Sequence, residues 1–173
     1  LGWGILLDPM GNIFGPRQSN EELLNAQKEI DKCKSVISKA FSKNVIVAEH
    51  GSSSESELGA NSIFHAHIHI IPIQNPIDVF NLYYEQGGKP LVYKEFSSIT
   101  NHKNSSYLYL SLEDGKHLIW TNSEKFSRQF VRKVCAEIYQ LPEYYNWKKY
   151  PFSENIDRSV TKLKPYCELD AVL

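Results

Sequence analysis

The chain has 173 residues and a formal charge of −1, from 19 Lys and Arg against 20 Asp and Glu. A hydrophobic share of 42% argues against wholesale disorder, and the balanced charge argues against a broad basic surface, so nucleic acid is not an expected partner. Three cysteines without CxxC spacing argue against a zinc-ligand framework and favour a reducing compartment, with the cytoplasm as the default location. No apolar stretch is long enough to cross a bilayer, and because Leu1 is not a methionine we expect a segment upstream of it.

The first half of the chain predicts two strands separated by a long helix. Residues 5–7 are apolar and are followed by an Asp-Pro pair, which is typical of a short buried strand. Ser19 and Glu22 have the spacing of a capping box, and apolar residues then recur at helical spacing, so we expect an amphipathic helix over about residues 20–42. The β-branched residues 45–47 predict the next strand.

The second half predicts further strands and two more helices. A strand over residues 63–71 is expected to end at Pro72, and a helix is expected over residues 77–86. Residues 107–120 contain two alternating runs around a turn, which predicts a β-hairpin, and a last helix is expected over residues 123–141. This order of elements predicts an α+β fold with a mainly antiparallel sheet.

Three histidines, His65, His67 and His69, alternate with apolar residues inside the predicted strand. Because side chains alternate on a strand, the three imidazoles are expected on one face of the sheet, with Ile68 and Ile70 on the other. Neighbouring imidazoles perturb one another's protonation, which disfavours such a cluster unless it has a function.

Two kinds of chemistry use a cluster of this type. Neutral imidazole is a common ligand of zinc and copper, and a metal site here would draw its remaining ligands from His50 or Glu49. Imidazole is also a good nucleophile toward phosphorus, because its pKa of about 6.5 leaves it largely unprotonated at neutral pH. The other usual metal ligands are poorly placed, so phosphoryl chemistry is favoured and the metal site is the alternative.

The run from His65 to Ile71 resembles the His-φ-His-φ-His-φ-φ signature of the histidine-triad superfamily of nucleotide hydrolases and transferases. Two flanking segments are similar to the same family. Gly59-Ala60-Asn61-Ser62 resembles its Gly-Gly-Gln-Ser segment, and Ile5 to Met10 resembles its apolar strand ending in Pro-Lys. The resemblance covers about residues 2–73.

The resemblance implies a histidine-triad-like fold with a long helix. We expect one domain over residues 1–173, with its core at about residues 2–73 and a C-terminal hairpin-helix extension at about residues 74–173. It also implies a homodimer formed through the long helix and a sheet edge.

Residue by residue, the resemblance implies a division of roles. His67 would be the nucleophile that takes a nucleoside monophosphate from the substrate and later gives it to water. His69 would contact the phosphate and the leaving group, and His65 would belong to the supporting hydrogen-bond network. Ser62 and Asn61 would help to hold the phosphate.

The predicted site includes one further histidine, His50. His50 follows the second predicted strand and is included among the substrate-binding residues. No cofactor is required for the covalent step, although magnesium would accompany a polyphosphate substrate.

The sequence departs from the family at two positions: Gly4 stands where the family often has histidine, and Met10 where it has lysine. Family chains usually start earlier, with a segment that helps to form the base pocket, so the base and the leaving group stay open.

Other interpretations of the same residues remain open. A nucleotide-binding or regulatory module would keep the triad without turnover. His102 and His117 lie in a polar loop and a hairpin strand, and we expect them at the surface.

Overall fold

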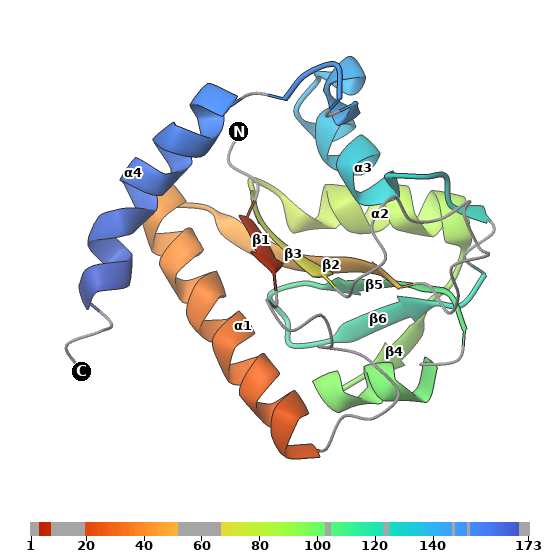
Figure 1. Ribbon diagram of the computed structural model, residues 1–173. Helices are drawn as coiled ribbons and strands as arrows, with labels where there is room; N and C mark the ends of the chain where they lie inside the picture. Colours follow the sequence, from red (N-terminus) through yellow and green to blue (C-terminus); the bar gives the residue numbers. More distant parts are fainter. Residues whose placement is uncertain are drawn as a thin grey trace.

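A twisted antiparallel sheet lies at the centre of the computed structural model (Figure 1). The structure describes residues 4–7, 20–51, 67–102, 105–122, 125–146, 148–151 and 153–169, and for residues 4–7, 20, 22, 67, 168 and 169 only the backbone. The described strands are β1 Gly4–Leu7, β2 Asn44–Gly51, β3 His67–Ile73, β4 Leu91–Tyr93, β5 Tyr107–Ser111 and β6 His117–Trp120. They form a 6-stranded sheet in the order β1-β3-β2-β5-β6-β4. The predicted α+β class with an antiparallel sheet is confirmed.

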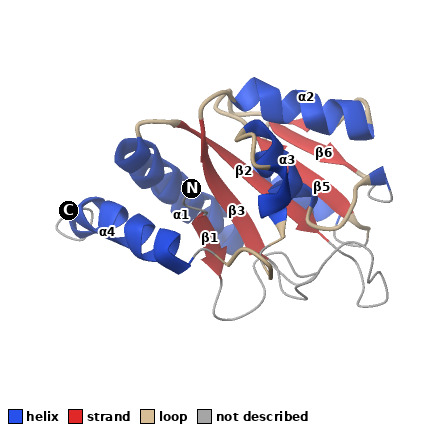
Figure 2. Cartoon of the chain, turned by 90° about the horizontal axis from the view of Figure 1, so that it is seen from above, coloured by secondary structure: helices blue, strands red, loops and turns tan. Residues whose placement is uncertain are grey.

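Helices cover both faces of this sheet. The described helices are α1 Asn20–Phe41, α2 Pro76–Gly87, α3 Phe130–Ile138 and α4 Ser153–Leu169, with the 3₁₀ helices η1 Phe96–His102 and η3 Pro142–Tyr145. α1 covers one face, called here the α1 face, and α4 lies alongside α1 (Figure 1). α2 and α3 cover the opposite face, called here the α3 face (Figure 2). In the part of the chain that the structure describes, no helix is long and apolar enough to span a membrane.

Alternation along the strands gives each face its own apolar layer. In β3, Ile68 and Ile70 pack under α1, whereas Ile71 and Ile73 pack under α2 and α3. The buried α1 layer consists of Ile30, Ile37, Val45, Val47, Ile68, Ile70, Phe96, Ile99, Tyr107, Tyr109 and Ile119. The buried α3 layer consists of Ile46, Ala48, Ile71, Ile73, Val79, Tyr83, Leu108, Leu110, Leu112, Leu118, Trp120, Phe126, Phe130, Val131, Val134 and Cys135.

The ends of α2 follow from its capping residues. The Asn75 side chain accepts a hydrogen bond from the Ile77 backbone N–H at 3.3 Å. Pro76 occupies the first turn, where backbone N–H groups have no partner within the helix, so the N–H that proline lacks costs no hydrogen bond. At the other end Gly88 has a φ of 76°, and its N–H donates to the carbonyl of Tyr84 at 2.7 Å. The predicted helix over residues 77–86 is therefore confirmed with one more residue at each end.

The prediction that the third strand ends at Pro72 is wrong, because β3 continues to Ile73. A proline fits a strand where its ring nitrogen faces no partner strand. Among the described residues, β1 pairs with β3 only as far as Ile70. The carbonyl of Pro72 instead accepts a hydrogen bond from the Tyr139 hydroxyl at 2.8 Å. The earlier part of that predicted strand, residues 63–66, lies outside the described residues.

The C-terminal third departs most from the predictions. The last predicted helix was expected from Ser123, but α3 begins at Phe130, because Gln129 has a φ of 58° that a right-handed helix cannot contain. α4 was not predicted, since its mostly exposed surface has a weak apolar stripe and Pro165 lies within it. It is attached to α1 partly through the Lys162 ammonium, 4.9 Å from the centre of the Phe41 ring.

The hydroxyl of Tyr83 offers a test of this packing. Tyr83 is 1% exposed in the α3 layer, and its hydroxyl has no hydrogen-bond partner among the described residues. We expect Tyr83→Phe to keep the ring contacts and to raise the free energy of unfolding by about 1 kcal/mol, because it removes a buried polar group. Urea denaturation measures this change.

The matched control for that substitution is Tyr109→Phe. The Tyr109 hydroxyl is paired with His117, so its removal is expected to lower the free energy of unfolding by about 1 kcal/mol or more. Equal destabilisation by both substitutions would contradict the packing described for Tyr83.

Candidate functional site

Strand β3 carries the part of the histidine triad that the structure describes. The backbone of His67 pairs with Leu7 of β1, and His69 pairs with Ile5 of β1 and with Ala48 of β2. Directly paired residues share a face of the sheet, and Ala48 belongs to the α3 layer. The buried side chain of His69 therefore lies on the α3 face.

His50 lies on the same face, on the neighbouring strand β2. It is buried, and it pairs with Leu108, a member of the α3 layer. Ala48 pairs with His69, and His50 is the next residue of β2 on that face, so His50 and His69 are diagonal neighbours. Such neighbours are about 7–8 Å apart. The structure thus brings two of the predicted site residues together.

The other predicted site residues cannot be located in this arrangement. His65, Asn61, Ser62 and the side chain of His67 lie outside the described residues. The backbone of His67 is described, two residues before His69 in β3. This strand pairs with β1 over His67 to Ile70 and with β2 over His69 to Ile73. The strand predicted to carry the nucleophile is therefore an interior strand of the sheet.

Glu49 occupies the α1 face directly behind His50. It is 3% exposed, and the Tyr107 hydroxyl donates a hydrogen bond to its carboxyl group at 2.8 Å. Burial raises the pKa of Glu49 to about 8, although the hydrogen bond from Tyr107 acts in the opposite direction. Gly51 leaves room for this pair, because a Cβ at Gly51 would lie 2.5 Å from the Tyr107 ring.

His117 forms a second polar pair on the α1 face, and the expectation that it lies at the surface is wrong. It is 8% exposed, and its Nδ1 is 2.8 Å from the hydroxyl of Tyr109. Burial lowers the pKa of His117, and the neighbouring Lys34 lowers it further, which favours a neutral imidazole. A histidine is usually expected at the surface, but all four residues of β6 are buried, and His117 pairs with Ser111, which is buried as well. His102 is half-buried, and its Nε2 is 3.1 Å from the Tyr93 hydroxyl.

The metal-site alternative would use the same histidines together with His50 or Glu49. Among the described residues, no group of three or more His, Cys, Asp or Glu side chains is placed to hold a metal ion. The side chains of His65 and His67 lie outside the described residues, so the metal alternative stays a hypothesis.

Comparisons with known proteins add no family to this description. No protein-family model matches the chain, and no curated protein has a significantly similar sequence. The candidate site therefore stands on the spacing of the histidines and on the geometry of β2 and β3.

The raised pKa of Glu49 generates a test of the α1 face. In the unfolded chain a glutamate has a pKa of about 4.3, whereas burial in the folded chain raises that of Glu49 to about 8. Between these values the folded state keeps a proton that the unfolded state has lost, so the free energy of unfolding decreases as the pH rises from about 5 to 8. We expect this decrease to reach a few kcal/mol at most.

The substitution that isolates this effect is Glu49→Gln. Its amide oxygen still accepts the hydrogen bond from Tyr107, but it does not titrate. Relative to wild type, the variant should become progressively more stable from pH 5 to pH 8 in urea denaturation. Stability curves that stay parallel over this range would show that Glu49 is ionised in the folded protein.

Proposed function

We propose that this protein is a nucleotide hydrolase or nucleotidyltransferase that acts at the α-phosphorus of nucleoside 5′-phosphate derivatives. Phosphoramidates and dinucleoside polyphosphates are the substrate classes in question. The observation that carries the proposal is the His-x-His-x-His spacing of residues 65–69, together with a fourth histidine, His50, on the same face as His69. A cluster of imidazoles on interior strands is suited to phosphoryl chemistry, because rigid strands hold catalytic groups in place better than loops.

The proposed reaction has two displacement steps. In the first, a ring nitrogen of His67 attacks the α-phosphorus, and the bond from phosphorus to the leaving group breaks. In the second, water attacks the same phosphorus, and the bond from phosphorus to nitrogen breaks, which releases the nucleoside monophosphate. Each step inverts the configuration at phosphorus, so the overall reaction retains it. No metal ion is needed for the covalent step, and magnesium would accompany a polyphosphate substrate.

The neighbouring residues would supply hydrogen bonds and charge. His69 would contact the phosphate and donate a proton to the leaving group, and His65 would orient the nucleophile through hydrogen bonds. Ser62 and Asn61 would bind phosphate oxygens, where donors stabilise the charge that develops in the transition state. His50 is assigned to the same phosphate-binding group, because it shares a face with His69.

The direct test is His67→Ala, with adenosine 5′-phosphoramidate and a diadenosine polyphosphate as substrates. We expect AMP release by the variant to fall by at least about 10³-fold, because the displacement then lacks its nucleophile. Chromatographic detection of AMP measures both rates. Both rates should be measured at the same protein concentration and with each substrate in turn.

The matched control is His102→Ala. His102 is a half-buried histidine of η1, and the proposal gives it no role in the reaction. This variant should keep AMP release within a few-fold of wild type. Comparable rates for His67→Ala and wild type would remove the nucleophile assignment, and tight nucleotide binding without turnover by wild type would favour the binding module.

A further inference from the structure

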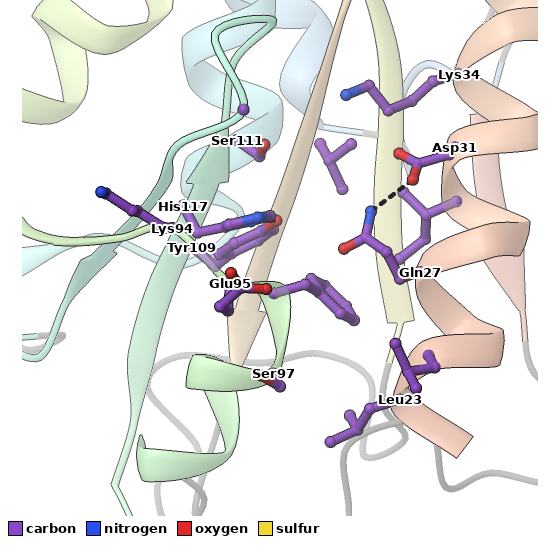
Figure 3. A pocket seen from close by; sticks show the side chains of 15 residues that line it. Leu23, Gln27, Asp31, Lys34, Lys94, Glu95, Ser97, Tyr109, Ser111 and His117 are labelled. Atoms are coloured by element: carbon purple, nitrogen blue, oxygen red, sulfur yellow. Dashed lines mark hydrogen bonds between the residues drawn. The ribbon is translucent and has the colours of Figure 1, made fainter. Parts of the chain in front are cut away.

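A cavity of about 510 Å³ lies on the α1 face, on the opposite side of the sheet from His50 and His69 (Figure 3). One wall is the N-terminal half of α1. The other consists of β5, β6 and the segment that joins β4 to η1. α1 packs closely against β2, β3 and η1, and the cavity lies between the N-terminal half of α1 and strands β5 and β6. A volume of this size suits a small molecule.

The floor of the cavity is polar, although it is buried. Tyr109, Ser111 and His117 line it, with exposures of 1%, 4% and 8%. On the α3 face, the same two strands carry only Leu108, Leu110, Leu118 and Trp120. A sheet face that needed only to pack under a helix would carry similar apolar residues. The Tyr109 hydroxyl is paired with His117 Nδ1 at 2.8 Å, and the Ser111 hydroxyl donates to the Leu112 carbonyl at 3.4 Å. Together they form a polar floor, which suits a polar ligand better than an apolar one.

The walls of the cavity carry charges of both signs. Asp31 and Lys34 extend from α1 toward the strands, and Gln27 donates a hydrogen bond to Asp31 at 3.0 Å (Figure 3). Lys94 and Glu95 line the opposite wall, so the formal charges balance. Burial lowers the pKa of His117, Lys34 lowers it further, and Asp31 and Glu95 raise it, which agrees with their positions in the cavity lining.

Apolar side chains complete the lining. Leu23 and Leu24 lie near the start of α1, and Ile30 and Phe96 belong to the sides of the cavity. Leu24 is a large apolar side chain that is 62% exposed, so this end of the cavity offers apolar surface to an incoming molecule.

We infer that the cavity binds a small zwitterion of the α-amino acid type, as a site separate from the histidines. The ligand ammonium group would lie between the carboxylates of Asp31 and Glu95, and its carboxylate would lie near Lys34 and the Ser111 hydroxyl. The apolar side chain of the ligand would contact Phe96. A neutral nucleoside fits less well, because it would desolvate side chains of both signs without supplying opposite charges.

The test is a ¹H–¹⁵N NMR titration of the full chain with the standard L-amino acids. At least one should give saturable shifts of the backbone amides of Phe96, Ser111 and His117. N-acetyl and carboxamide derivatives of the binding amino acid each lack one charge, and either should bind at least about fivefold more weakly. Adenosine serves as the uncharged comparison.

Substitutions of the wall charges complete the test. Lys34→Gln and Glu95→Gln should each weaken binding by about fivefold or more, whereas Lys89→Gln, at an exposed position outside the cavity, should leave it unchanged. His69→Ala should also leave it unchanged, because His69 lies on the other face. The inference is overturned if no amino acid shifts these amides at millimolar concentration, if the singly charged derivatives bind equally well, or if adenosine binds more tightly.

Discussion

The double pairing of β2 is the constraint on which the candidate histidine site depends. β3 pairs along one edge of β2 and β5 along the other, and helices cover both faces, so residues 45–48 are almost inaccessible to solvent. A shift of one residue in this register would exchange every side chain between the two faces. The register sends the consecutive residues Glu49 and His50 to opposite faces. His50 thereby approaches His69, and Glu49 pairs with Tyr107.

The two faces of the sheet differ in chemistry because they differ in what covers them. α2 and α3 cover the α3 face with aromatic and aliphatic side chains, and the histidines of β2 and β3 share that face with an apolar layer. α1 covers the other face over β2 and β3 but leaves a cavity beside β5 and β6. Tyrosine, serine and histidine side chains line that cavity. One sheet can therefore support two separate sites without a shared residue.

Much of the central fold could be predicted from local patterns. The helical spacing before Phe41 and the alternation in residues 107–120 each specify an element by themselves. Three-residue β4 and exposed α4 could not be predicted in this way, because pairing with β6 and packing beside α1 stabilise them.

In the candidate sites too, local patterns predict some features, whereas others depend on contacts between distant residues. The spacing of the triad predicts that its members share a face, but its approach to His50 depends on the register of β2 and β3. The burial of Glu49 and His117 depends on partners 58 and 8 residues away, Tyr107 and Tyr109 respectively, and on the helix above them. No local pattern marks either residue as buried, because glutamate and histidine are usually exposed or half-exposed.

The central claim is a covalent nucleotidyl-histidine intermediate, and the stereochemistry at phosphorus tests it most directly. A substrate made chiral at the α-phosphorus with sulfur and an oxygen isotope would be hydrolysed, and the configuration of the product determined by ³¹P NMR. Net retention of configuration is expected, because two inverting displacements follow one another at the same phosphorus. Net inversion would contradict it, because a single attack by water leaves no place for the histidine nucleophile.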